Sequence, residues 1–104
     1  MEEIKRYEVI IRPRAEKEIE AAYEYLSIFC GEYAWKFVAG MEKAILGLEI
    51  FPNGGSNLVN YNKKFKDLKY IEFRKYAIVY RVCVDKVYVE TVYHMSRNPK
   101  GLEV

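Results

Sequence analysis

Residues 68–94, with the sequence LKYIEFRKYAIVYRVCVDKVYVETVYH, decide the fold of this 104-residue chain. They contain three strand-like runs, 68–74, 76–84 and 87–94, which are rich in β-branched and aromatic residues. Only Lys75 and the pair Asp85-Lys86 separate the runs, and links this short make neighbouring strands antiparallel. The middle run is apolar at nearly every position, which predicts a central strand covered on both faces. The region therefore predicts an antiparallel meander.

Two amphipathic helices are expected before the meander. From Arg14 onward, small or apolar residues recur at steps of three and four, at Ala15, Ile19, Ala22, Tyr23, Leu26 and Cys30. From about 33 to 49 the same spacing returns at Ala34, Phe37, Val38, Met41, Ile45 and Leu48. Gly31 is expected to end the first helix, and the segment FPNGG at 51–55 to end the second. The short link between them predicts an αα-hairpin.

The N-terminal segment completes the order of elements. Residues 7–11 are β-rich and precede Pro13, which suits the first turn of a helix. Residues 52–64 read as a polar loop before the meander. The order is β-α-α-β-β-β, which predicts one α+β domain over residues 1–104, with the helical hairpin packed on one face of an antiparallel sheet.

The composition limits the functional classes. The chain is 51% hydrophobic and 31% charged, as globular domains are, and its net charge of +2 is weak support for a nucleic-acid partner. Cys30 and Cys83 lack CxxC spacing and only one histidine is present, so we expect two buried thiols, no metal site and no cofactor. No segment reads as a signal peptide or a membrane span, which favours a cytoplasmic protein.

Strand alternation gathers polar residues on one predicted face of the sheet. Ile71 and Phe73 are expected to meet the helices, which leaves Glu72 and Arg74 on the open face, away from them. The polar set of the last strand is expected to join that face. The predicted open-face set is Glu72, Arg74, Arg81, Glu90 and His94, with Arg97 just beyond.

These residue types suit RNA cleavage at a 2′-hydroxyl, which needs a base, an acid and a cation for the phosphate. His94 is a candidate acid or base, because its ordinary pKa lies near neutrality. Arg74 and Arg81 are candidate phosphate ligands, and Glu72 or Glu90 a candidate base. An equally open alternative is that the carboxylates and arginines form ordinary surface ion pairs and that His94 is structural.

A basic cluster precedes the meander. Lys63, Lys64, Lys66 and Lys69, with Arg97 at the far end, are candidate RNA-phosphate contacts. The alternative is a solubilising loop and strand edge.

Several stretches together carry a resemblance to a known family. They are YEVIIRPRA at 7–15, EIEAAYEYL at 18–26, LEIFP at 48–52, KYAIVYRV at 75–82 and VYVETVYHMSR at 87–97. In this order, with the Phe-Pro helix stop and the His-x-x-Arg ending, they resemble the RelE/ParE superfamily, the toxins of type II toxin–antitoxin modules. The resemblance covers nearly the whole chain. The family often has Arg where this chain has Lys69, which weakens a bidentate phosphate role there.

The resemblance implies a cognate antitoxin partner and two alternative targets. RelE-like members cut mRNA on the ribosome without a metal, and the resemblance would place their working residues around Arg74, Arg81 and His94. ParE-like members inhibit DNA gyrase without nuclease activity. The residue types favour the nuclease, and the mild charge favours the gyrase inhibitor. On balance the sequence predicts a ribosome-dependent mRNA endonuclease, with the gyrase inhibitor as the alternative; an inactive remnant ranks last. Trp35 lies off the apolar stripe and is a candidate antitoxin contact, unless it packs internally.

Overall fold

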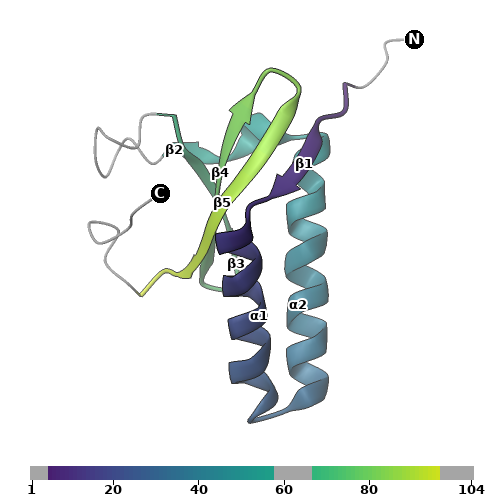
Figure 1. Cartoon of the computed structure of the whole chain (residues 1–104), viewed down its shortest axis with the longest axis vertical. Helices are drawn as coiled ribbons and strands as arrows, with labels where there is room; N and C mark the ends of the chain where they lie inside the picture. Colours follow the sequence, from purple (N-terminus) through teal and green to yellow (C-terminus); the bar gives the residue numbers. More distant parts are fainter. Residues whose placement is uncertain (1–4, 58–66, 97–104) are drawn as a thin grey trace.

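Two helices cover one face of a twisted sheet in the computed structural model, which describes residues 5–57 and 67–96 (Figure 1). Strand β1 (Glu8–Ile11) leads into helix α1 (Pro13–Ser27), which has its proline in the first turn as predicted. Helix α2 (Gly31–Leu46) returns antiparallel to α1. The hairpin extends past the end of the sheet, so its tip stands clear of the strands.

Two short 3₁₀ turns and a short strand follow the hairpin. They are η1 (Gly47–Glu49), η2 (Pro52–Gly54) and β2 (Ser56–Asn57). The segment expected to be a polar loop thus contains a turn and an edge strand in its described part. The meander then comprises β3 (Lys69–Phe73), β4 (Tyr76–Cys83) and β5 (Lys86–His94). Gly31 begins α2 and does not end α1, since α1 stops at Ser27, whose hydroxyl donates to the Tyr23 carbonyl.

The sheet has the strand order β1-β5-β4-β3-β2. The meander is antiparallel as predicted, and the predicted α+β architecture is confirmed. The sheet as a whole is mixed, because β1 pairs with β5 in parallel. No short turn links these two strands, so nothing local dictates an antiparallel pairing. All the helices and the other strands lie between them in sequence, and together they bring the chain back in the same direction.

The core lies between the helices and the sheet. Buried residues from α1 and α2 pack on the helix-facing residues of β4 and β5. The set comprises Ala15, Ile19, Ala22, Phe37, Met41, Ile45, Ile78, Tyr80, Val87, Val89 and Val92. A smaller cluster on the open face contains Leu68, Ala77, Val79 and Tyr93. The central strand β4 is therefore covered on both faces, as its apolar sequence predicts.

Tyr80 ties the core to the turn after the helices. Its side chain is fully buried, and its hydroxyl donates to the Pro52 carbonyl at 2.6 Å and accepts from the Gly55 N–H at 3.1 Å. Burial raises the pKa of the Tyr80 hydroxyl. A Cβ at Gly55 would collide with this hydroxyl, so the close approach requires a glycine.

Both cysteines are exposed, contrary to the prediction of two buried thiols. Cys30 lies in the link between the helices, and Cys83 ends β4 beside a sharp turn, where Val84 has φ 56°. Neither position faces the core, because the link and the turn both lie at the surface.

Candidate functional site

A β-bulge in β5 decides where the candidate acid–base residue lies. Tyr80 pairs with Val89 and Val79 with Thr91, which leaves Glu90 as an extra residue on β5. Side-chain alternation restarts after Glu90. His94 consequently stands opposite Tyr76 on the face that meets the helices. The prediction that His94 shares the open face is wrong, because an unbroken alternation was assumed.

His94 belongs to an aromatic cluster at one end of the sheet. Its ring stands edge-on to Tyr76, with 5.2 Å between centroids, and the Tyr76 ring stands edge-on to Phe37 of α2 at 5.3 Å. The Nδ1 atom of His94 lies 2.7 Å from the Ser96 hydroxyl oxygen. The half-buried imidazole borders a hollow of about 590 Å³ that Tyr25 and Glu18 of α1 also line. Its surroundings thus combine aromatic rings with the Ser96 hydroxyl and, across the hollow, the Glu18 carboxylate.

Arg74 lies at the same end of the sheet as His94. It occupies the β3–β4 turn with φ 46°, and its guanidinium carbon is 5.6 Å from the centroid of Phe73 and 6.0 Å from that of Tyr33 on α2. Both distances fit cation–π contacts. The exposed arginine therefore leans along the helix-facing aromatic cluster rather than out over the open face.

Glu72 and Arg81 lie on the open face, as predicted. Glu72 stands opposite Ala77 and is exposed, while Arg81 stands opposite Tyr88 and is exposed. Arg81 is five positions along β4 from Tyr76, the partner of His94, which corresponds to about 17 Å along the strand. The structure therefore brings Arg74 and His94 to one end of the sheet and leaves Arg81 towards the other end, on the opposite face.

The remaining predicted contacts are dispersed or lie outside the described residues. Glu90 at the bulge pairs with Arg12 at 3.4 Å, between Nε and Oε1. Lys69 on β3 donates from Nζ to the Asn57 side chain at 2.9 Å. The predicted RNA contacts Lys63, Lys64, Lys66 and Arg97 all lie outside the described residues.

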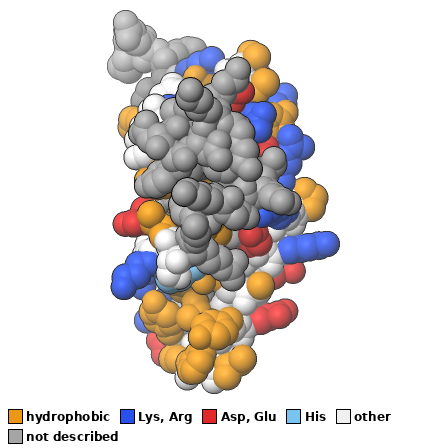
Figure 2. Space-filling view, turned by 90° about the vertical axis from the view of Figure 1, so that its left-hand side faces the viewer, with side chains coloured by type: hydrophobic (Ala, Val, Ile, Leu, Met, Phe, Trp, Pro, Cys, Tyr) orange, Lys and Arg blue, Asp and Glu red, His pale blue; other side chains and the backbone are white. Residues whose placement is uncertain are grey.

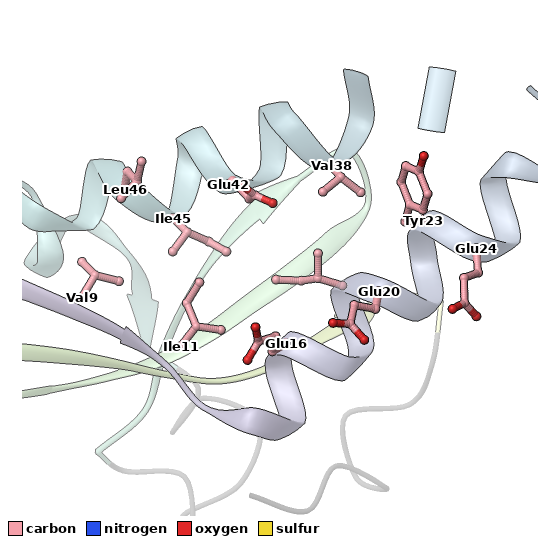
Figure 3. Close-up of a pocket in the computed structure, with 11 residues that line it drawn as sticks. Val9, Ile11, Glu16, Glu20, Tyr23, Glu24, Val38, Glu42, Ile45 and Leu46 are labelled. Carbon is pink, nitrogen blue, oxygen red and sulfur yellow. The ribbon is translucent and has the colours of Figure 1, made fainter. Parts of the chain in front are cut away.

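A groove between the helices is a second candidate site (Figure 3). It encloses about 520 Å³ and is bounded by α1, α2 and the residues of β1. Its apolar lining consists of Val9, Ile11, Ile19, Tyr23, Val38, Ile45 and Leu46. Ile19 and Ile45 are buried at its base, whereas Tyr23 and Leu46 are exposed at its margin. Buried apolar residues at the base and exposed residues at the margin are typical of binding grooves.

The groove's polar side chains are all acidic. Glu16, Glu20 and Glu24 follow α1 and Glu42 comes from α2, and each is exposed (Figure 3). Among the described residues, none of the four forms an ion pair. Sequence reasoning missed this site. The regular spacing of four between the α1 glutamates was the available signal, because that spacing places them in one row along a helix.

Apolar side chains gather at the tip of the hairpin, where Figure 2 shows a hydrophobic surface at the lower end of the molecule. We name this surface the tip patch; it comprises Tyr25, Ile28, Phe29, Tyr33 and Trp35, all exposed. Trp35 is 63% exposed, so it does not pack internally and stays a candidate partner contact. Clustered exposed aromatics of this kind are typical of protein-binding surfaces.

Two kinds of feature are absent from the residues that the structure describes. No cluster of three His, Cys, Asp or Glu side chains in this part of the chain could hold a metal ion. Over the same ranges, neither helix combines the length and apolarity that crossing a bilayer demands.

Known proteins provide an independent comparison. The family model for the ParE toxin of the type II toxin–antitoxin system parDE matches residues 9–99. The chromosomal ParDE toxin–antitoxin system of P. aeruginosa contains a chain that superposes with a TM-score of 0.73 at 14% identity, covering 86% of this chain and 97% of that one. No match was found among curated protein sequences.

A second solved structure, the toxin–antitoxin complex RelBE2 of Mycobacterium tuberculosis, gives a TM-score of 0.65 at 15% identity. The alignment covers 90% of this chain and 97% of that one. At such identities the two structures show the shared fold, and the family model supplies the assignment. The chain belongs to the ParE toxin family, within the RelE/ParE superfamily of type II toxin–antitoxin toxins.

Proposed function

We propose that this toxin acts by binding DNA gyrase, without nuclease activity, and that a cognate antitoxin neutralises it. The observation that carries the proposal is the bulge at Glu90, which separates His94 from Arg81. The match to the ParE family model supports the same choice.

Cleavage of RNA at a 2′-hydroxyl imposes a geometric demand. The base, the acid and the cation must all reach groups on one phosphodiester, within hydrogen-bond distance of the atoms they serve. Arg81 and His94 are on opposite faces of the sheet and about 17 Å apart along β4. Glu72 is also on the face away from His94. Arg74 shares the end of the sheet where His94 lies, but Arg81 and Glu72 face away, so the full candidate set does not converge on one phosphate.

Inhibition by binding makes no such demand and needs only a complementary surface. The tip patch offers exposed aromatic side chains, and Tyr25 and Phe29 there pack edge-on at 5.3 Å between centroids. Aromatic residues that keep a preset geometry lose little entropy on binding. This surface and the acidic groove suit a toxin that works through protein contacts.

The test is a paired assay on the purified chain. One arm measures supercoiling of relaxed plasmid by gyrase, and the other maps mRNA ends by primer extension during translation in vitro. We expect inhibited supercoiling and intact mRNA. His94→Ala and Arg81→Ala should inhibit supercoiling to the same extent as the unmodified chain, because neither side chain is assigned a role in binding.

The opposite result would be equally clear. New mRNA ends that need ribosomes and vanish in His94→Ala, together with normal supercoiling, would replace this proposal with the ribosome-dependent nuclease. Circular dichroism on each variant verifies that a loss of effect is not a loss of fold.

A further inference from the structure

The turn between β3 and β4 holds two cations in a backbone conformation that suits smaller residues. Arg74 and Lys75 link Phe73 to Tyr76, and their φ values are 46° and 69°. Asn-Gly is the favoured pair in a two-residue hairpin turn with both φ values positive, because a larger side chain is strained there. The Lys75 carbonyl accepts the Met95 N–H at 2.7 Å, which fixes the turn. Unfavourable residues that persist in such a turn point to a role in function.

The two cations lie beside the tip patch without a compensating charge. Arg74 and Lys75 are exposed, and neither forms an ion pair within residues 5–57 and 67–96. The Arg74 guanidinium is within cation–π distance of the Phe73 and Tyr33 rings, and Tyr33 belongs to the patch. The acidic groove lies away from this turn, because it is lined by β1, which β5 and β4 separate from β3. The turn therefore favours an acidic partner at this edge of the patch.

The tip patch is large for an exposed apolar surface. Its five side chains are each 44–78% exposed. Together they present on the order of 500–700 Å² of mainly apolar area. Exposed apolar patches of this size mark protein-binding surfaces. A standard complex buries about 800 Å² on each partner, so a protein that covers the patch extends beyond it and reaches the neighbouring turn at Arg74.

The shape favours a larger protein over a second copy of the chain. The hairpin tip protrudes past the end of the sheet (Figure 1), so two tips that met would bury little more than the patch on each copy. Obligate homodimers bury about 2,000 Å² or more in total, which exceeds what two patches supply. A concave surface of a larger protein can enclose the tip and contact Arg74 as well. Nucleic acid suits the patch less, since its five side chains carry no charge for phosphates.

We propose that the tip patch and the turn at Arg74 and Lys75 form the surface that binds gyrase, and that this surface takes an acidic segment of the enzyme. Tyr25 and Phe29 are the apolar anchors, because their rings already pack edge-on at 5.3 Å between centroids. Arg74 and Lys75 select the carboxylates of the segment by charge. The inference rests on the proposed function, which makes gyrase the partner, and it adds the surface and the chemistry that recognise the enzyme.

Binding of the gyrase holoenzyme to the immobilised full chain, without DNA, tests this surface. Phe29→Ala should weaken binding by about tenfold or more, since a few aromatic anchors contribute most of the affinity of an interface. Phe51→Ala is the matched control, because Phe51 is 73% exposed and Phe29 72%, but Phe51 lies beyond the other end of α2. Arg74→Glu should weaken binding about tenfold at low salt and less at high salt. Lys43→Glu makes a like change of charge in the last turn of α2 and should change nothing.

A turn variant separates loss of binding from loss of fold. Arg74→Asn combined with Lys75→Gly puts the favoured residues in the turn, so the urea midpoint of unfolding should rise. Gyrase binding by the same variant should fall about tenfold at low salt, because both cations are removed. A more stable chain that binds less cannot owe its loss to unfolding. Unchanged binding in this variant would overturn the role of the turn.

Three other results would overturn the inference: equal binding by Phe29→Ala and Phe51→Ala, binding only when DNA is present, or a dimer in sedimentation that dissociates with Phe29→Ala. The second would assign the cations to nucleic acid, and the third would assign the patch to a second copy. The supercoiling assay separates this inference from the proposed function. If the unmodified chain and Phe29→Ala inhibit supercoiling equally, gyrase remains the target and only the surface is wrong. If the unmodified chain neither binds gyrase nor inhibits it, the proposed function is wrong as well.

Discussion

The two halves of β5 are built differently, although they belong to one strand. Residues 86–89 lie between β4 and β1, and both of their backbone edges belong to ladders. Beyond Glu90, β4 remains on one side, but no strand in the described residues flanks the other. There Glu18 of α1 accepts the Val92 N–H at 3.1 Å and the Thr91 hydroxyl at 2.5 Å. The Glu18 carboxylate thus accepts a backbone hydrogen bond that a neighbouring strand would otherwise accept.

This difference explains where the candidate residues lie. In the first half, Val87 and Val89 point to the helices and Tyr88 to the open face, in strict alternation. In the second half the bulge restarts the alternation and brings His94 to the helix side. The pairing with β1 ends at Val89, and the side chains of β5 change faces at the next residue, Glu90. One local irregularity therefore decides which side chains lie on the same face.

Deleting single residues from the two halves should give the largest contrast. Deleting Tyr88 shifts the following residues by one position along β5. If the loss of the bulge compensates for this shift, Glu90 occupies the position of Val89, which is fully buried beneath the helices. An unpaired buried carboxylate costs on the order of 3–5 kcal/mol. Deleting Glu90 leaves every other side chain on its present face and removes only its exposed contact with Arg12, at a cost below about 1 kcal/mol.

Urea unfolding of the two deletion variants measures this contrast. Equal losses of stability would contradict the assignment of Glu90 as the extra residue, because then neither half could accommodate a shift of register. Far-ultraviolet circular dichroism should show native helix and strand content for the Glu90 deletion.

A smaller effect is expected from removing the carboxylate that supports the second half. Glu18→Ala leaves the Val92 N–H and the buried Thr91 hydroxyl without this acceptor, which should lower the free energy of unfolding by about 2–3 kcal/mol. Glu18→Gln should lose less, because its amide oxygen still accepts. Arg14→Ala is the control, since Arg14 only pairs with Glu18 at 3.8 Å near the surface. A loss from Glu18→Ala no larger than from Arg14→Ala would contradict the supporting role.

Much of the fold could be predicted because its signals are local. The helical spacing, the Phe-Pro stop and the short meander links each lie within a few residues, and all are confirmed by α1, α2 and the antiparallel ladders. The parallel pairing of β1 with β5 could not be predicted in the same way, since Val9 and Val87 meet only through the whole intervening chain. Its determinants are tertiary.

The candidate site was less predictable for a related reason. Ile71, Phe73 and Glu72 lie on their predicted faces because β3 is regular. The polar Glu90 follows the apolar Val89, as it would in a strand with no bulge. The sequence alone therefore gives no sign of the irregularity. Only the pairing with β4 shows that it is an extra residue. The four carboxylates of the groove were visible in sequence, but their meeting across two helices was not.

The smallest loss of stability is expected at Tyr80, which belongs to the last regular pair of β4 and β5 before the bulge. It stands opposite Val89, and Tyr80→Phe leaves the Pro52 carbonyl and the Gly55 N–H without their partner. The loss should be about 1–2 kcal/mol near neutral pH. Gly55→Ala disturbs the same hydroxyl in a second way, because the added Cβ would collide with it.

The raised pKa of Tyr80 gives this loss a pH dependence. As the pH rises above the ordinary value of 10.0, the unfolded tyrosine ionises while the buried one stays protonated, so the unmodified chain loses stability. Phenylalanine cannot ionise, and the stability gap between the two proteins should narrow with rising pH. The rest of the chain is the same in both proteins, so its contribution cancels in this difference. A constant gap from neutral pH to well above 10.0 would mean that the folded hydroxyl ionises as readily as the unfolded one, which its burial argues against.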